Sequence, residues 1–418
     1  MTKVLNLLLV AVFATFLATP LRAQSLPTTS PARAGFSPER LERMHATLRG
    51  FVDEGKHAGY ISLLARDGRI VDFQTYGYRD LEGKLPMEKD TICRIYSMSK
   101  IVTSVAVLIL HEEGKFNLDD PAGNYLPALK GMKVMNGGSQ EKPLLVEARP
   151  ITIKHLLTHT SGLIYDFDGN TSLNQLYQRA NLWESSSLPE FISRVGKLHL
   201  KHQPGEAFSY GINTDVLGAL VEQVSGKSFE EFLRERIFVP LKMKDTSFDV
   251  PAEKMHRVAK TYRHGPDGKL APAEPLLGTW PEPGRGIASG GAGLFSTVGD
   301  YARFAQMLLN GGQLDGARIL GRKTVEFMTT NHLTALPTGS HAFNPAMGFG
   351  LGVEVRIDSG KAAFVGSLGQ FGWYGAATTY CQIDPKEKLV AILFVQHFPY
   401  NQHGMFAKFA TGYYQALE

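Results

Sequence analysis

A long apolar run without proline extends from residue 97 to residue 114. Its hydrophobic positions include Ile101, Val105, Leu108 and Ile109, which follow the three- and four-residue spacing of one helix face. The run ends at an acidic pair followed by Gly114, a sequence typical of a helix C-terminus. The pattern therefore predicts a buried helix over 97–114.

Shorter apolar patterns predict strands near both ends of the chain and helices between them. The predicted strands are 60–66, 70–78, 351–357, 376–383 and 389–396, and the segment 91–95 leads directly into the helix at Ser97. Further predicted helices are 38–54, 153–158, 214–224, 229–238, 297–309 and 406–417. This order predicts an α+β fold, in which an antiparallel sheet of N- and C-terminal strands is flanked by helices. We expect a single domain over 24–418, with a sheet subdomain (36–129 and 278–418) and an inserted, mostly helical subdomain (130–277).

The first 23 residues have the pattern of a secretory signal peptide. Lys3 precedes an uncharged run with an apolar centre, and Pro20 and then Leu21-Arg22-Ala23 follow it, ending in a small residue. An uncleaved membrane anchor is the alternative, but the apolar centre is short and Pro20 follows it. We expect cleavage after Ala23, a periplasmic or secreted protein, and no membrane span after cleavage.

Charge and cysteine content narrow the class of protein. Loss of Lys3 and Arg22 with the signal peptide lowers the formal net charge from +4 to +2. A balance this small, without a basic cluster, argues against nucleic acid as a partner. Cys93 and Cys381 are too few for a disulfide framework, and we expect two separate buried thiols. An oxidising compartment leaves a single bridge open.

Ser97 and Lys100 form a Ser-x-x-Lys pattern at the start of the predicted helix. Residues three apart lie on the same helix face, so the two side chains are neighbours. An unprotonated lysine can take the proton of a serine hydroxyl and so activate it as a nucleophile. The pattern is short, and a helix-capping serine with a solvated lysine would look the same.

Two other segments carry candidate chemistry. Tyr210 follows the Pro204-Gly205 turn, and its phenol can relay protons beside a Ser/Lys pair, although tyrosines in such places are often only packed. The glycine-rich segment 369–377 enters a predicted strand, and backbone amides at such an edge can bind an oxyanion. A bulged strand end is the alternative for that segment.

Four motifs in one order resemble those of the serine β-lactamase and penicillin-binding-protein superfamily. They are 97–100 (SMSK), 156–163 (LLTHTSGL), 204–218 (PGEAFSYGINTDVLG) and 289–294 (SGGAGL). The chain looks closest to class C β-lactamases and their esterase relatives, the family VIII carboxylesterases. The resemblance implies that Ser97 is the nucleophile, Lys100 the base and Tyr210 the partner acid/base. It also implies an oxyanion hole formed by the backbone N–H groups of Ser97 and Ala376.

The chain departs from the family pattern at two positions. The family's Tyr-x-Asn is replaced by Tyr210-Gly211-Ile212, so Asn213 falls one place late. The Lys-Thr-Gly triad of β-lactamases is replaced by Trp373-Tyr374-Gly375, as in the family's esterases. Tryptophan cannot attract a substrate carboxylate as lysine does. We therefore expect Trp373, Gly375 and Ala376 to line a site for uncharged substrates.

These observations predict a serine hydrolase that forms an acyl-enzyme, most simply a carboxylesterase on small acyl esters with weak β-lactam hydrolysis. A β-lactamase or D-alanyl-D-alanine carboxypeptidase is the first alternative, and an inactive homologue that only binds β-lactams or peptidoglycan fragments is the second. We expect no cofactor and no metal, because the His155-x-x-x-His159 pair lacks the following glutamate of a metalloprotease motif. The expected partner is a small ester or lactam.

Overall fold

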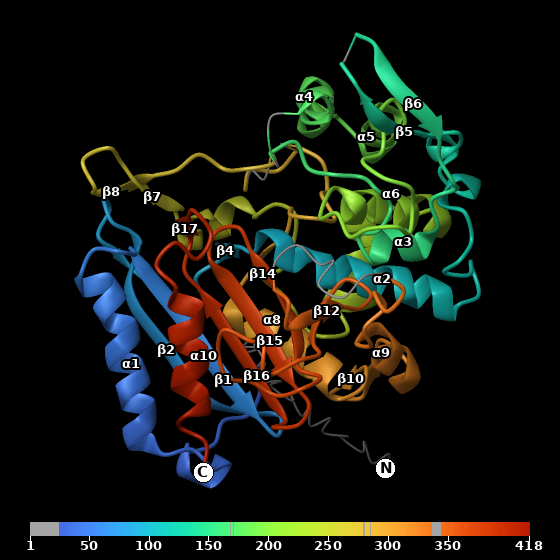
Figure 1. Cartoon of the computed structure of the whole chain (residues 1–418). Coiled ribbons are helices and arrows are strands. Elements are labelled where there is room, and N and C mark those ends of the chain that lie inside the picture. Colours follow the sequence, from blue (N-terminus) through green and yellow to red (C-terminus); the bar gives the residue numbers. More distant parts are fainter. Residues whose placement is uncertain are drawn as a thin grey trace, which may run out of the picture.

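The structure is a computed structural model that describes residues 25–139, 141–167, 169, 171–278, 281–284, 286–336 and 344–418. The predicted signal peptide lies outside the described residues. Figure 1 shows a large twisted sheet with helices on both of its faces, and a second, mainly helical region beside it. Within the described residues, no helix has the length and apolar content needed to cross a membrane.

The main sheet combines strands from the two ends of the chain, as predicted. It contains eight strands in the order β12-β13-β14-β15-β16-β1-β2-β3, and every neighbouring pair is antiparallel. The C-terminal strand β16 pairs directly with the N-terminal strand β1. The bounds are β1 Gly59–Arg66, β2 Arg69–Asp80, β3 Leu85–Pro86, β12 Met347–Phe349, β13 Glu354–Arg356, β14 Phe371–Gly375, β15 Thr379–Asp384 and β16 Leu389–Phe394.

Both faces of the sheet are buried, and β16 shows how the sequence achieves this. Leu389, Ala391 and Leu393 belong to the apolar cluster under α1 and α10. The alternate residues Val390 and Ile392 belong to the larger cluster on the opposite face, where α8 packs. Successive side chains of a strand point to opposite faces, so a continuous apolar run is what a strand buried on both sides requires.

Ten α-helices surround the sheet or form the second region within the described residues. They are α1 Pro38–Asp53, α2 Ser99–Glu112, α3 Ile153–Leu157, α4 Ser172–Arg179, α5 Leu188–Val195, α6 Asn213–Ser225, α7 Phe229–Leu233, α8 Val298–Leu309, α9 Arg322–Met328 and α10 Met405–Tyr414. Helices α1 and α10 pack against each other, whereas α2 packs against α6 and α7. Figure 1 places α2 between the sheet and the helical region.

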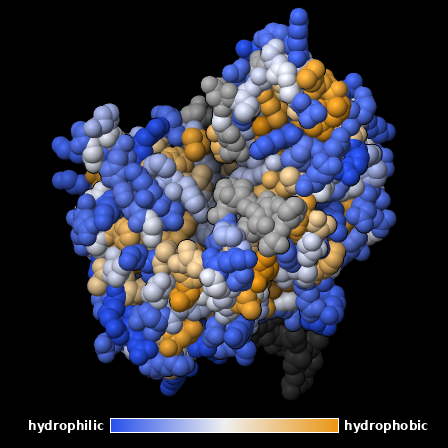
Figure 2. All heavy atoms as spheres, viewed as in Figure 1, coloured by the Kyte–Doolittle hydropathy of each residue, from blue (hydrophilic) through white to orange (hydrophobic). Residues whose placement is uncertain are grey.

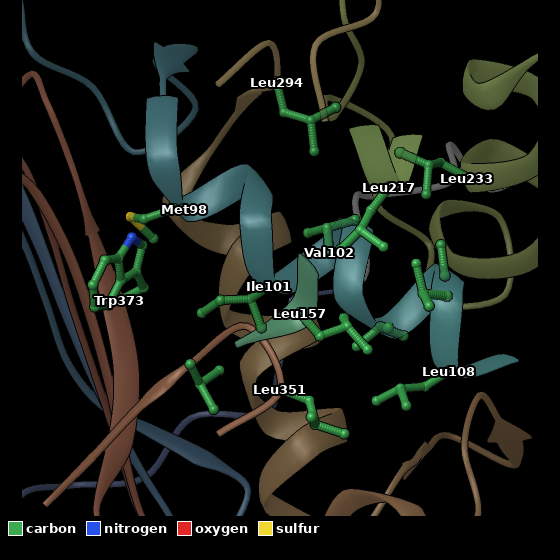
Figure 3. Close-up of a cluster of buried hydrophobic side chains, with 14 of the residues drawn as sticks. Met98, Ile101, Val102, Leu108, Leu157, Leu217, Leu233, Leu294, Leu351 and Trp373 are labelled. Atoms are coloured by element: carbon green, nitrogen blue, oxygen red, sulfur yellow. The ribbon is translucent and has the colours of Figure 1, made fainter. Parts of the chain in front are cut away.

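Helix α2 is the buried helix that the apolar pattern predicts. All its residues from Ser99 to Leu110 are buried. Figure 3 shows Val102 of α2 among Leu217 of α6 and Leu233 of α7, and Met98 beside Trp373 of β14. A helix enclosed by apolar neighbours along most of its length is held in one position by close packing.

Side-chain caps begin two of the helices on either side of the sheet. The Ser37 side chain accepts a hydrogen bond from the Arg40 amide at the start of α1, and Thr297 does the same for Asp300 at the start of α8. These local bonds satisfy amides that a helix leaves unpaired at its N-terminus, which is why the caps can be predicted from sequence.

Three sequence-based expectations for elements need correction. Ser97 lies not in α2 but in the 3-10 turn Tyr96–Met98 directly before it. The strand expected at 376–383 begins at Thr379, and residues 376–378 form the turn that joins it to β14. The segment 351–357 contributes only β13, preceded by the separate strand β12. Tight turns with positive φ, such as Thr378 at φ 60°, are not marked by hydrophobic periodicity.

The middle of the chain contains strands that the sequence did not predict. They are the hairpin β5 Lys133–Gly138 and β6 Pro143–Glu147, and the pair β7 Tyr262–His264 and β8 Leu270–Pro272. Strand β17 His397–Phe398 adds to β7 in parallel. The remaining short pairs are β4 Cys93–Arg94 with β9 Phe295–Ser296, and β10 Gln313–Leu314 with β11 Ala317–Arg318. Cys93 and Cys381 are both free and buried.

The visible surface is mostly hydrophilic. On the face shown in Figure 2, hydrophobic residues form small separate patches among hydrophilic ones. Scattered apolar side chains of this kind are normal on a soluble surface.

Candidate active site

Ser97 stands on a backbone turn whose geometry is unusual. The preceding residue, Tyr96, has φ 44°, in the left-handed region that a bulky residue rarely adopts. Tyr96 and Met98 are fully buried, whereas Ser97 between them remains partly accessible. Strained backbone of this type persists only where its surroundings hold it, and it occurs often at functional sites. The turn presents the Ser97 hydroxyl while anchoring the residues on either side of it.

Lys100 lies beside that hydroxyl, in the first turn of α2. Its Nζ donates hydrogen bonds to Ser97 Oγ (3.2 Å), Tyr165 OH (3.0 Å) and the Gly291 carbonyl (2.8 Å). The side chain is 0% exposed, and all three partners are uncharged oxygens. The carbonyl can only accept a hydrogen bond, but the two hydroxyls can also donate one. A neutral Lys100 amine can therefore keep its bond to Gly291 and accept the proton of Ser97.

Tyr210 and Trp373 complete the group that the sequence predicted. The Trp373 indole N–H donates to Tyr210 OH over 3.2 Å. The Tyr210 ring centroid lies 4.7 Å from Lys100 Nζ. Four residues from three distant segments of the chain are thus brought together: Ser97, Lys100, Tyr210 and Trp373.

Tyr165 is a member of the site that sequence reasoning missed. It is 1% exposed, it accepts a hydrogen bond from Lys100, and its ring centroid lies 5.5 Å from that of Tyr210. Tyr165 follows the 156–163 motif by two residues, which is the only hint the sequence offers. Its contact with Lys100 spans 65 positions of the chain, so local pattern alone does not predict it.

Asp215 is a second missed residue, and it acts through the 289–291 segment. Its Oδ1 accepts hydrogen bonds from Ser289 Oγ (2.5 Å) and the Gly291 amide (2.9 Å). The carbonyl of the same Gly291 is the acceptor for Lys100. Burial raises the pKa of the Asp215 carboxyl, and the positive charge of Lys100 opposes that rise. The carboxyl thus fixes the loop that orients Lys100.

Asn213 does not face the candidate nucleophile. Its side-chain amide lies 2.9 Å from His159 Nδ1, and its oxygen accepts a hydrogen bond from Ser161. It therefore connects α6 to the 158–163 loop. The centroid of the His159 ring lies 4.8 Å from that of the Tyr210 ring, so the two rings pack against each other.

The two histidines of the His-x-x-x-His pair have structural roles. The His155 Nδ1 accepts a hydrogen bond from the Thr152 amide in a capping box at the start of α3. His159 is 0% exposed, and burial together with the charge of Lys100 holds its pKa well below the ordinary value. The Asn213 side-chain amide contacts His159 Nδ1, so His159 connects its loop to α6, whereas His155 caps α3.

The end of β14 lies against the segment that carries Ser97. A Cβ on Gly375 would meet Thr379 Oγ1 at 2.1 Å and the Ile95 carbonyl at 2.3 Å, so only glycine permits this approach. Ala376 follows in the turn after β14 and packs against the apolar cluster that contains Tyr96. The predicted strand-edge residues are therefore adjacent to the nucleophile turn.

A pocket shares one residue, Tyr165, with the candidate site. It is lined by aromatic, polar and aliphatic residues: Tyr165, Asp166, Tyr177, Gln178, Asn181, Leu182, Trp183, Glu184 and Ile212. Tyr165 belongs both to this pocket and to the hydrogen bonds of Lys100.

The fold and this arrangement of Ser, Lys and Tyr define the class of serine hydrolases that carry their nucleophile in a Ser-x-x-Lys motif at the start of a buried helix. The beta-lactamase family matches residues 44–412. The chain belongs to the beta-lactamase family, and the predicted resemblance is confirmed.

The most similar proteins include esterases. Protein Rv1367c of Mycobacterium tuberculosis is 33% identical over 368 residues, which cover 86% of this chain and 90% of that protein. The lovastatin esterase of Penicillium rubens is 30% identical over 351 residues, covering 80% of this chain and 86% of the esterase. The structure of EstCE1, a hydrolase with promiscuous acyltransferase activity, matches with a TM-score of 0.78 and 26% identity over 90% of this chain and 99% of that one. The chain is accordingly a beta-lactamase-family serine hydrolase, and similar proteins are esterases and acyltransferases.

Proposed function

We propose that this protein is a carboxylesterase that cleaves uncharged esters of small acyl groups through an acyl-enzyme. Lys100 removes the Ser97 proton as Ser97 Oγ attacks the ester carbonyl, and the backbone N–H groups of Ser97 and Ala376 stabilise the oxyanion. Tyr210 relays the proton to the leaving alcohol. Water then attacks the acyl-enzyme and releases the acid, which restores Ser97.

The observation that carries this proposal is the hydrogen bond from the Trp373 indole to Tyr210 OH. β-Lactamases of the resembling class offer a lysine at this place to the carboxylate of the lactam. Here a neutral, 6% exposed indole contacts the candidate proton relay instead. A charge-assisted contact with a carboxylate contributes about 1.5–3 kcal/mol, so its loss lowers kcat/KM for anionic lactams by about 10–100-fold.

The test is one substrate panel applied to the purified protein. It contains nitrophenyl esters of increasing acyl length, a chromogenic cephalosporin and a D-Ala-D-Ala peptide. We expect the highest kcat/KM for a short neutral ester, with slow cephalosporin cleavage. Preference for the cephalosporin or the peptide would replace the esterase proposal with the first alternative. Stoichiometric binding without turnover of any ester would favour an inactive binding protein.

Acyl transfer to an alcohol is a second candidate reaction, because relatives with that activity share the fold. EstCE1 is described as a hydrolase with promiscuous acyltransferase activity. An added primary alcohol would compete with water for the same acyl-enzyme. We expect a transesterified product whose share rises with alcohol concentration, whereas formation of acid alone would restrict the activity to hydrolysis.

Trp373→Lys is the variant that tests substrate charge directly. We expect it to narrow the gap between neutral ester and cephalosporin by about 10-fold or more, because the ammonium group can pair with the lactam carboxylate. Trp373→Phe is the matched control: it removes the same indole N–H without adding charge. The measurement is kcat/KM for both substrates in wild type and in both variants. An equal gain with phenylalanine would show that charge is not the determinant.

A further inference from the structure

Four histidines form a cluster outside the site described above. They come from segments far apart in the chain: His57 in the loop between α1 and β1, His264 at the end of β7, His397 at the start of β17, and His403 in the turn before α10. Figure 1 shows β17 beside β7, close to one end of α10. The parallel pairing of β17 with β7 brings two of the segments together.

Three of these rings converge on one point. Each of His264, His397 and His403 offers a ring nitrogen, and these three nitrogens lie within 4.8 Å of one another. Zn–N bonds of about 2.0–2.1 Å in a tetrahedral site place ligand nitrogens about 3.4 Å apart. Small side-chain rotations therefore suffice to bring the three nitrogens onto one ion.

The hydrogen bonds around the cluster leave nitrogen lone pairs directed inward. His264 Nε2 donates to the Gly55 carbonyl (3.3 Å), and His397 Nε2 contacts Gln402 Oε1 (3.2 Å). A carbonyl can only accept, so the proton of each ring sits on Nε2 and the lone pair on Nδ1. Metal-binding histidines are oriented in this way by a carbonyl or carboxylate on their second nitrogen.

The inward nitrogens are buried and have no hydrogen-bond partner in the described structure. They are His264 Nδ1, His397 Nδ1, His403 Nε2 and both nitrogens of His57. His397 is 0% and His57 1% exposed. A buried polar group without a partner costs about 1–3 kcal/mol, so five such nitrogens in one place call for a ligand.

We propose that His264, His397 and His403 bind one divalent transition-metal ion, with zinc as the natural candidate. His57 lies against this site, its ring centroid 4.7 Å from that of His397 and 5.3 Å from that of His403. The sequence alone predicted no metal site, because the His155/His159 pair lacks the following glutamate of a metalloprotease motif. The cluster proposed here uses none of those residues.

The ion would fasten segments that adjoin the Ser97 turn. The His397 amide donates to the Ala377 carbonyl (3.0 Å), and Thr378 Oγ1 donates to the His397 carbonyl (2.9 Å). The next residue, Phe398, packs its ring 5.6 Å from that of Tyr96. A metal bound here is a structural element that holds the 376–378 turn, and it takes no part in the ester chemistry.

The test uses the full-length mature protein without an affinity tag, stripped with a chelator and titrated with Zn²⁺ by calorimetry. We expect one ion per chain and a rise in Tm on binding. Co²⁺ in place of Zn²⁺ should produce visible absorption bands from nitrogen coordination. His264→Gln and His403→Gln each alter a half-buried ring and should weaken binding by more than about 100-fold, since loss of an outer contact alone costs about 10–100-fold.

Two further variants separate a built site from adventitious binding. Gln402→Leu leaves the ligands intact but removes the contact to His397, and should lower Zn²⁺ affinity by about 10–100-fold. His256→Gln changes an exposed histidine outside the cluster and should leave the affinity unchanged. Binding that is equal in wild type and in folded His403→Gln overturns the proposal, as does a wild-type protein that binds no Zn²⁺.

Discussion

Ser97 and Ser99 are two positions apart, and their surroundings separate their roles. Ser97 Oγ lies 3.2 Å from Lys100 Nζ, whereas the Ser99 hydroxyl accepts a hydrogen bond from the Leu294 amide (3.1 Å) and is fully buried. One hydroxyl is available for chemistry, and the other holds two segments together.

Ser97→Ala should abolish esterase activity and leave the fold intact. Ser99→Ala, the matched control, should keep most activity but lower the free energy of unfolding by about 1–3 kcal/mol, because the Leu294 amide loses its partner. The measurements are kcat/KM, urea unfolding and mass spectrometry after a fluorophosphonate probe. An adduct on a serine other than Ser97 would exclude it as the nucleophile.

Lys100 Nζ lies 4.7 Å from the centroid of the Tyr210 ring, and we expect the two residues to act as one proton-transfer unit. Lys100→Ala and Tyr210→Phe should each lower kcat by about 10²–10⁴-fold, and the double variant should lose little more than the worse single one. Tyr177→Phe is the control, since Tyr177 lines a pocket together with Tyr165 but donates its hydroxyl proton to the His199 carbonyl (3.0 Å). Strictly additive losses would show that the two residues act independently.

At the scale of elements, β13 carries a buried carboxyl next to the strand that presents Trp373. Glu354 lies opposite Gly372 of β14 and accepts a hydrogen bond from Gln382 Nε2 (2.9 Å). Burial raises the pKa of Glu354 to about 7, from an ordinary value of 4.5. Between pH 4.5 and about pH 7 the folded protein keeps a proton on Glu354 that the unfolded chain releases. The free energy of unfolding therefore falls as the pH rises.

Glu354→Gln should remove that pH dependence. The stabilising contribution of Glu354 is complete below about pH 4.5 and is lost as the pH rises to about 7, a change of about 3 kcal/mol. As the pH rises over that range, the free energy of unfolding of wild type should fall by about 3 kcal/mol relative to that of the variant. Urea unfolding at several pH values measures both free energies. Glu253→Gln, at an exposed position, is the control. Parallel curves for wild type and Glu354→Gln would contradict the prediction.

At the scale of the whole molecule, the sheet joins the two ends of the chain, because β1 and β16 are neighbours. Residues 25–36 also take part in the fold: Leu26 is buried, and Phe36 bridges to Leu417. The described fold therefore includes residues that closely follow the predicted cleavage point.

We propose export of the protein with cleavage after Ala23. Expressed in a bacterium that has a periplasm, the mature protein should begin at Gln24, as read by N-terminal sequencing of the periplasmic fraction. Val10→Arg, which places a charge in the apolar centre, should block export, and Val10→Leu should not. A periplasmic protein that retains Met1 would contradict cleavage.

Local interactions explain what the sequence by itself determined. The caps at Ser37 and Thr297 act within three residues, the apolar run of β16 needs only its own alternation, and the three-residue spacing places Lys100 beside Ser97 in any helical turn. The order of the family motifs along the chain then predicted that Tyr210 and Trp373 belong to the same site as Ser97 and Lys100.

Only the tertiary structure decided the features that depend on contacts between distant segments. Lys100 donates a hydrogen bond to Tyr165 across 65 positions of the chain and one to Gly291 across 191 positions. No periodicity in the sequence encodes either contact. The close approach of Gly375 to Ile95 likewise exists only once β14 is paired in the sheet. The histidine cluster arises because β17 pairs in parallel with β7, which places side chains more than a hundred residues apart around one point. Chain entropy opposes each of these encounters, and the packing of the whole core offsets it, so the information lies in the complete fold rather than in any segment.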